Sequence, residues 1–367
     1  MKGFTLSVGL LAGTIIGAGI FSLPYVINQI GLITGVFYLG FFALVYFLIF
    51  IMYATLLESS EGEHRFIFLA RKFLPRPIAG LASFTAITDL IFTLTIYLIL
   101  GVSFLGLIAD MSVLTALFAF WFFSSIFIFA KLSFQGVAEV LGTLAIVAVV
   151  VLVFFSGSGV PDVPLFKELD LNKLLLPFGP LLFAYAARVA IPKIIGEYRR
   201  GKSAGRPFSF KKAIFFGTFL PAVVYLVFVF GVLRLAPDVS PETLGSLTFL
   251  SPIVLLLLGI LGILALWTSY FMIGADVRET LKYDLKIPGW ASSLFVLALP
   301  LGLYFAGFQE FLTVLSFTGG VFLGLEGIFI IAMWWRAFPS HRLRYFTLPL
   351  SAVFVLALIY SLVDFVL

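Results

Sequence analysis

Residues 13–25 read Gly13-Thr-Ile-Ile-Gly17-Ala-Gly19-Ile-Phe-Ser-Leu-Pro24-Tyr25 and lie within the first of many long apolar segments. Three glycines and a proline weaken the continuity of a helix. Backbone that leaves the helix at membrane depth is tolerated only where it is buried in protein or lines a cavity. Because small residues at this spacing also let two helices pack closely, this stretch alone leaves a closely packed helix and a broken helix equally open.

The composition around this stretch is that of an integral membrane protein. Of the 367 residues, 62% are hydrophobic and 11% are charged, whereas soluble domains contain about 25% charged residues. Apolar runs of about 20 residues, long enough for a helix to cross the hydrocarbon layer, recur along the whole chain. We therefore expect an all-α membrane protein with about 11 transmembrane helices, near residues 5–27, 31–57, 78–108, 112–130, 137–155, 174–198, 211–235, 249–275, 289–307, 311–335 and 346–366.

The positive charges favour one orientation in the membrane. Lys and Arg are enriched in the cytoplasmic loops of membrane proteins. If the N-terminus is cytoplasmic, nearly all basic residues outside the spans fall on that side, and the opposite loops hold only Lys167, Lys173 and Arg234. We expect a multi-pass protein of the cell (plasma) membrane with its N-terminus in the cytoplasm and, after an odd number of spans, its C-terminus outside.

The charges and motifs also exclude several function classes. The net charge of +5 comes from loops at the membrane edge and not from a basic face, so nucleic acid is not an expected partner. The sequence has no phosphate-binding loop and no paired carboxylates in a cleft outside the membrane, so neither an enzyme nor an ATP-driven pump is expected. The expected partners are the lipid bilayer and a small molecule, and protein partners stay open.

The sixth apolar run, residues 174–198, contains a second irregularity. Arg188 places a charge where lipid makes it costly, and Pro192 disfavours a continuous helix. Two interrupted helices, one opening each half of the chain, are typical of transporters built from inverted repeats with a site at the bilayer midplane. We expect a single transporter domain over residues 1–367, with repeats at 5–155 and 174–335 and an additional helix at 346–366.

The quoted first-run string resembles the first-helix signature of the amino acid/auxin permease and aromatic amino acid permease group, within the amino acid-polyamine-organocation superfamily. The residues Phe183-Ala184-Tyr185, followed by Ile191-Pro192 and a basic loop, are similar to the sixth helix of that group. The resemblance implies a LeuT-like fold of five plus five inverted helices with one extra C-terminal helix. It also implies secondary active amino acid transport by alternating access, in which spans 1, 2, 6 and 7 rock against spans 3, 4, 8 and 9.

In such a fold the ends of the broken helices hold the amino acid. N–H groups at the start of a half-helix suit a carboxylate, and carbonyl groups at the end of one suit an ammonium group, without full charges in lipid. The first run would supply the N–H groups, both broken runs the carbonyl groups, and an aromatic residue of the sixth run a wall of the side-chain pocket. The expected substrate-binding residues are Thr14, Gly17, Ala18, Gly19, Thr93, Phe183, Ala184 and Tyr185.

A sodium ion is the expected coupling ion. Adjacent hydroxyl groups in the eighth run resemble the sodium-site helix of LeuT-like symporters, and oxygen ligands suit a hard cation. The candidate ligands are Gly13, Ile16, Ala265, Thr268 and Ser269. The alternative is that these hydroxyl groups bind carbonyl groups one turn back in their own helix. The fifth run lacks the lysine that some proton-coupled relatives carry at the sodium position, which favours sodium over a proton; no other cofactor is expected.

Three ionisable residues within the runs are candidates for coupling or gating. Asp89 shares one helix face with Thr93 and Tyr97, and Arg188 is able to pair with either Asp89 or Glu326. A proton relay, a contact with the substrate side chain and a gate are the functional interpretations. The structural interpretation is a buried ion pair that fixes helix packing.

Three other function classes stay open at this point, and one of them is an intramembrane enzyme. A membrane amino acid sensor or receptor with a transporter fold is not distinguishable from a carrier by sequence. A channel would be expected to show a repeated pore loop or rings of charge, and not two dissimilar broken helices.

Overall fold

The computed structural model describes residues 2–60, 65–130, 132–157, 173–236 and 238–366, and all the regular structure in these ranges is helical. Lipid offers no hydrogen-bond partners, so a spanning segment must satisfy its backbone internally, as a helix does. The longer helices are α3 (Leu32–Glu58), α5 (Arg76–Ile108), α7 (Leu132–Ser156), α10 (Phe210–Leu235), α11 (Pro252–Glu279), α12 (Gly289–Phe305) and α15 (Thr347–Val366). The shorter ones are α4 (Phe66–Phe73), α6 (Val113–Ile126), α13 (Phe311–Phe317) and α14 (Gly324–Ala337).

The apolar helices coincide with the predicted spans. Within the described residues, seven helical segments are long and apolar enough to cross a membrane, and a bent helix pair near the N-terminus makes up to eight. Three shorter apolar helices, Val113–Phe129, Val140–Ser156 and Gly289–Phe305, lie at the remaining predicted spans. The all-helical membrane fold is confirmed, whereas the count of eleven crossings stays a prediction.

Both predicted interruptions are present. Helix α1 (Lys2–Ile15) ends before Gly17, which is extended, and a 3-10 turn η1 (Ala18–Ser22) leads into α2 (Leu23–Ile30), with a bend of 45° between the two parts. In the sixth run, α8 (Phe178–Tyr185) and α9 (Ala190–Ser203) are separated by residues 186–189. Pro24 and Pro192 each fall in the first turn of the second half-helix, where a missing N–H costs little.

The glycines of the first run serve close packing as well. A Cβ atom built on Gly19 would lie 2.6 Å from the Cα atom of Ala184 in α8, so only glycine allows the two half-helices to approach this closely. The two interpretations of the glycine-rich stretch are therefore both correct. The broken first helix packs directly against the broken sixth.

The tenth run contains a third irregularity that the sequence does not predict. Between α13 and α14, residues Thr318–Leu323 form a π-helical turn, η6, which packs against α8. The backbone of Gly319 contacts the backbone of Gly179 so closely that a Cβ atom would overlap it. This wider turn sets the start of α14, which carries Glu326 in its first turn, and π-helical turns recur at functional sites.

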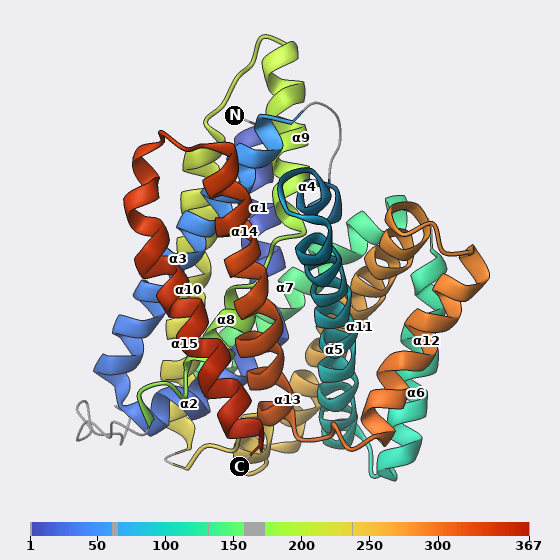
Figure 1. The fold of residues 1–367 in the computed structure, drawn as a ribbon. Coiled ribbons are helices and arrows are strands. Elements are labelled where there is room, and N and C mark those ends of the chain that lie inside the picture. Colours follow the sequence, from blue (N-terminus) through green and yellow to red (C-terminus); the bar gives the residue numbers. More distant parts are fainter. Residues whose placement is uncertain (1, 61–64, 131, 158–172, 237, 367) are drawn as a thin grey trace.

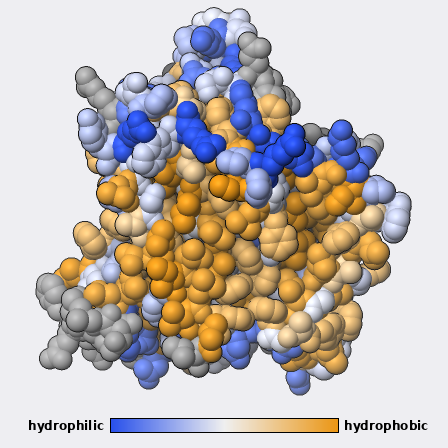
Figure 2. All heavy atoms as spheres, viewed as in Figure 1, coloured by the Kyte–Doolittle hydropathy of each residue, from blue (hydrophilic) through white to orange (hydrophobic). Residues whose placement is uncertain are grey.

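The helices form one bundle (Figure 1). Helix α11 packs against α5 and α7, and α1 packs against α10. Helix α1 starts at the end of the bundle where α4 and α9 lie, and α15 finishes at the opposite end. Figure 2 shows hydrophilic side chains gathered at the α4 and α9 end, above a continuous hydrophobic surface.

Candidate functional site

The two helix interruptions open onto one cavity of about 110 Å³. Its lining comes from the first, third, sixth, eighth and tenth apolar runs, which lie far apart in the sequence. The cavity brings together nine of the residues predicted from the sequence: Thr14, Gly17, Ala18, Gly19, Asp89, Thr93, Phe183, Arg188 and Glu326. The other lining residues are Ile15, Leu90, Tyr97, Ala186, Ala187, Val189, Ile273 and Leu323.

The break in the first helix exposes peptide groups to this cavity. The first N–H groups of the helical stretch Ala18–Ile30 have no carbonyl partner within that stretch. Tyr97 of α5 lies beside them: its hydroxyl group interacts with the backbone of Ala18, and a Cβ atom on Gly17 would be 3.1 Å from it. The sequence places Tyr97 on the same helix face as Asp89 but does not mark it as a site residue.

The hydroxyl group of Thr14 is already used within its own helix. It donates a hydrogen bond of 2.8 Å to the carbonyl oxygen of Leu10. Thr14 therefore lines the cavity with a hydroxyl group whose proton is already donated within its own helix. The hydroxyl group of Thr93 makes no hydrogen bond in the described structure, and Thr93 lines the cavity from α5.

Two predicted substrate residues, Ala184 and Tyr185, do not line the cavity. Tyr185 is fully buried on the other side of α8, where its hydroxyl group donates to the carbonyl oxygen of Leu39 at 3.0 Å and its ring stacks on Tyr46. Ala184 packs under Gly19. Within the sixth run, Phe183 is thus the aromatic residue that reaches the cavity.

Tyr225 of α10 connects the two broken helices. Its buried hydroxyl group lies 2.7 Å from the carbonyl oxygen of Ile15 and 2.6 Å from that of Ala184. These carbonyl groups are at the ends of α1 and α8, where the helix no longer supplies N–H partners. No pattern in the sequence marks this residue, because a tyrosine in an apolar run is usually core or lipid-facing.

We expect Tyr225→Phe to destabilise the protein by about 1–3 kcal/mol, since it leaves a buried carbonyl group at a helix break without a partner. The thermal unfolding midpoint in detergent measures this loss. Tyr360→Phe is the matched control because that hydroxyl group makes no hydrogen bond in the described structure. A variant as stable as the wild type would show that the hydroxyl group of Tyr225 does not stabilise the two helix breaks.

Charged side chains form the polar wall of the cavity. Arg188, in the unwound segment of the sixth run, donates to Glu326 at 2.6 Å, and both side chains are largely buried, with 14% and 8% exposure. The guanidinium group of Arg188 also lies over the ring of Phe66, 4.6 Å from its centroid. Of the two partners that the sequence allowed for Arg188, the structure selects Glu326 for the direct ion pair.

Asp89 is left as the unpaired acid of this wall. It is 5% exposed, and its Oδ1 atom has no hydrogen-bond partner. The wall thus holds two carboxyl groups and one guanidinium group. Because a buried unpaired charge is costly in a membrane, the arrangement favours a positively charged occupant or a proton next to Asp89.

The candidate sodium ligands lie beside the cavity and not in its lining. Thr268 donates to the carbonyl oxygen of Ala265 at 2.9 Å, which is the usual bond of a hydroxyl group in a membrane helix. Thr268 faces α7, where a Cβ atom on Gly142 would overlap its hydroxyl group, and a Cβ atom on Gly13 would be 2.8 Å from the hydroxyl group of Thr143. Helix α7 therefore lies against the candidate ligand residues of α1 and against those of α11.

The other two candidate sodium ligands differ in their surroundings. The N–H group of Ile16 continues the α1 hydrogen-bond pattern by donating to Ala12, so the helix is unwound only beyond it. Ser269 interacts through its side chain with the hydroxyl group of Tyr97. Tyr97 thus connects the cavity with the candidate ion site.

Comparison with known proteins identifies the family. Residues 2–330 match the family described as "Transmembrane amino acid transporter protein". The chain belongs to this amino acid transporter family. It is therefore a transporter by family and not an enzyme, and no curated protein sequence matches it.

Solved transporter structures share the fold. The structure of MhsT in complex with L-phenylalanine is 15% identical, with a TM-score of 0.63 over 99% of this chain and 97% of that one. The closed form of Mhp1, a nucleobase-cation-symport-1 family transporter with bromovinylhydantoin bound, is 14% identical, with a TM-score of 0.60 over 99% and 91%. The Eremococcus coleocola manganese transporter is 11% identical, with a TM-score of 0.62 over 99% and 86%. These likenesses confirm the expected LeuT-like fold.

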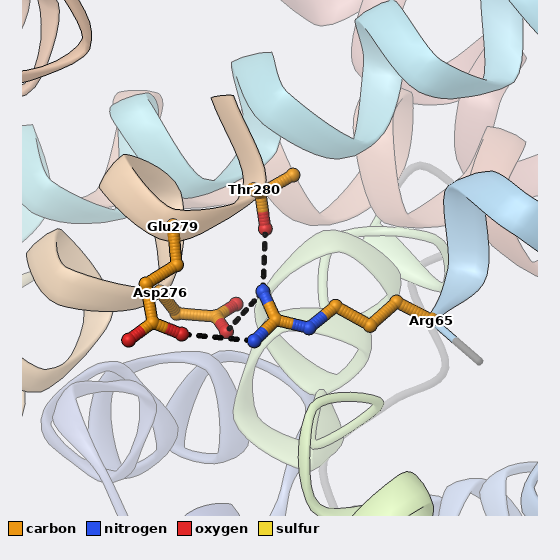
Figure 3. A network of polar contacts seen from close by, with 4 residues as sticks. All are labelled: Arg65, Asp276, Glu279 and Thr280. Atoms are coloured by element: carbon orange, nitrogen blue, oxygen red, sulfur yellow. Dashed lines mark hydrogen bonds and ion pairs between the residues drawn. The ribbon is translucent and has the colours of Figure 1, made fainter. Parts of the chain in front are cut away.

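A network of polar contacts connects helices at the end of the bundle where α4 and α9 lie, which we call the basic end (Figure 3). Arg65, just before α4, lies 2.9 Å from Glu279 and 3.8 Å from Asp276 of α11, and 3.4 Å from the hydroxyl group of Thr280. Burial lowers the pKa of Arg65, but the hydrogen bond to Glu279 and the charge of Asp276 raise this pKa by more, so it lies above its usual value. The network joins the segment between α3 and α5 to the end of α11.

Proposed function

We propose that this chain is a secondary active transporter that carries an amino acid across the membrane by alternating access, coupled to an ion. The observation that carries the proposal is the meeting of two broken helices at one cavity. A zwitterion needs hydrogen-bond donors for its carboxylate and acceptors for its ammonium group, and half-helix ends provide both without full charges. Membership of the amino acid transporter family supports the same assignment.

Within the cavity, each end of the substrate has a proposed partner. The carboxylate binds the N–H groups of Ala18 and Gly19, with the Tyr97 hydroxyl group as a further donor beside them. The ammonium group binds carbonyl oxygens at the end of α1 and near Phe183. The side chain of the amino acid then extends between Phe183 and Thr93.

Uptake of radiolabelled amino acids into proteoliposomes tests this function. A carrier accumulates its substrate above the external concentration when an ion gradient is imposed, and stops when the gradient is collapsed. A channel would equilibrate the amino acid without accumulation, and a sensor would bind it without uptake. Either of these two results would overturn the proposal.

We infer that sodium is the coupling ion, bound by the carbonyl groups of Gly13, Ile16 and Ala265 and the hydroxyl groups of Thr268 and Ser269. For this, Thr268 must turn its oxygen lone pairs from the packing against α7 toward α1. The proximity of Ser269 to Tyr97 gives a direct route from ion to substrate.

The double change Thr268→Ala/Ser269→Ala is expected to abolish the sodium stimulation of uptake, because it removes both side-chain oxygen ligands. The measurement is the initial uptake rate as a function of sodium concentration. Thr218→Ala is the control: Thr218 is equally buried in α10 and its hydroxyl group bonds to Ile214 one turn back. Unchanged sodium stimulation in the double variant would exclude the proposed ion site.

A proton is the alternative coupling ion, and the unpaired oxygen of Asp89 favours it. The charged and titratable groups that face Asp89 are Arg188, Glu326 and Tyr46. If an imposed pH gradient drives uptake without sodium, and Asp89→Asn removes that response while leaving substrate binding intact, the proton replaces sodium in the mechanism.

We further infer that the basic end of the bundle faces the cytoplasm of the cell that carries the protein in its plasma membrane. The enrichment of Lys and Arg in the loops of that end supports this orientation, which leaves the end of α15 outside. The repeats at 5–155 and 174–335, with an additional helix at 346–366, remain the proposed internal organisation.

A further inference from the structure

A second, larger cavity shares no lining residue with the first one. It has a volume of about 840 Å³ and runs along α5 and α12, which contact each other, to the turn that follows α11. Its walls are almost wholly apolar and open toward the outer surface: Phe84 is 64% exposed, Phe295 46% and Leu299 40%. We call this cavity the α5–α12 groove.

Two arginines stand at one end of the groove. Arg71 comes from α4 and Arg76 is the first residue of α5, and both line the groove. Arg71 donates a hydrogen bond of 3.2 Å to the carbonyl oxygen of Asp284, so its guanidinium group is held across the groove end. No carboxylate in the described part of the chain forms an ion pair with Arg76.

This end of the groove lies at the expected depth of lipid headgroups. Tyr283, in the turn that follows α11, and Trp290, the second residue of α12, lie close to this end in the sequence, and they are 64% and 74% exposed. Exposed Trp and Tyr residues mark the interface between membrane and water. The same end of the molecule carries the band of hydrophilic residues in Figure 2, directly above the apolar surface.

We propose that the α5–α12 groove binds one anionic phospholipid, with its phosphate between Arg71 and Arg76 and an acyl chain along Phe84 and Leu299. The groove matches both parts of such a molecule: a long apolar channel takes the chain, and two guanidinium groups take the phosphate, which they bind with several donors each. Basic pockets between membrane helices bind anionic headgroups in this way. A zwitterionic lipid has a compensating ammonium group that the two arginines repel.

The test is native mass spectrometry of the purified transporter titrated with palmitoyl-oleoyl phosphatidylglycerol or with the matching phosphatidylcholine. We expect one tight phosphatidylglycerol site, and we expect Arg71→Gln/Arg76→Gln to weaken it about 30-fold. The control Arg206→Gln/Arg344→Gln removes two exposed arginines at the same end but outside the groove and should leave the site unchanged. Inorganic phosphate should not compete, because it lacks the acyl chain.

A second variant tests the apolar half of the site. Gly80 lines the groove, and a Cβ atom at this position would have no neighbouring atom within 4 Å, so Gly80→Leu adds its side chain at the groove without a clash at Cβ. It should weaken phosphatidylglycerol binding, whereas Gly40→Leu, at a glycine with equal free space on α3, should not. Equal binding of phosphatidylcholine, or unchanged phosphatidylglycerol binding in both groove variants, would overturn the proposal.

Discussion

Replacing Arg188 with glutamine is expected to destabilise the protein by roughly 3–5 kcal/mol, because it leaves Glu326 as a buried acid without its partner. The pair is 2.6 Å apart and almost out of reach of water. Asp89 lies in the same wall and adds a second carboxyl group to the uncompensated charge. The folded fraction after extraction and the unfolding midpoint in detergent measure the loss.

The double variant Arg188→Gln/Glu326→Gln serves as the control for this prediction. Removing both charges leaves two amides that are able to hydrogen-bond to each other, so most of the lost stability should return. If Arg188→Gln is as stable as the wild type, or if the double variant is no better than the single one, the pair does not hold the unwound segment in place.

Gly17→Leu is expected to abolish amino acid binding while the protein remains folded. The side chain would enter the cavity from the break itself, starting 3.1 Å from the hydroxyl group of Tyr97, which is the flexible end of a side chain. Binding of radiolabelled amino acid by scintillation proximity and the unfolding midpoint together separate the two effects. Gly40→Leu, in open space on α3, controls for the added side chain.

The variant Gly19→Ala is the comparison for Gly17→Leu, because it is expected to lower stability. Its Cβ atom would meet the backbone of Ala184 at 2.6 Å, so it should destabilise the contact between the two broken helices by about 1–3 kcal/mol. Retained affinity in Gly17→Leu would show that the substrate does not bind at the break.

The helix breaks are predictable from the sequence because glycine, proline and a charge are visible exceptions in an apolar chain. Gly17 and Pro24 mark the first break, and Arg188 and Pro192 mark the second. Glu326 and Asp89 are found in the same way, since any ionisable residue within a span needs a partner or a function. Their convergence on one cavity follows from the fold that the resemblance implied.

Whether an uncharged residue points to lipid, to the protein interior or to the cavity is not predictable in the same way. In a soluble helix, polar and apolar faces differ, but in this chain lipid-facing and buried faces are both apolar, so periodicity carries little information. Of the two aromatic residues offered by the sequence as a wall of the pocket, Phe183 lines the cavity and Tyr185 packs against α3. The role of Tyr225 in joining the two breaks is visible only in the structure. The π-helical turn at Thr318–Leu323 depends on the contact between Gly319 and Gly179, which no local pattern reveals.

The most direct measurement is a cryo-electron microscopy structure of the transporter with the amino acid that it accumulates. We expect density in the cavity between Gly17 and Phe183, with the carboxylate within about 3 Å of the backbone nitrogen atoms of Ala18 and Gly19. A ligand bound elsewhere, with this cavity closed by side chains, would contradict this binding mode.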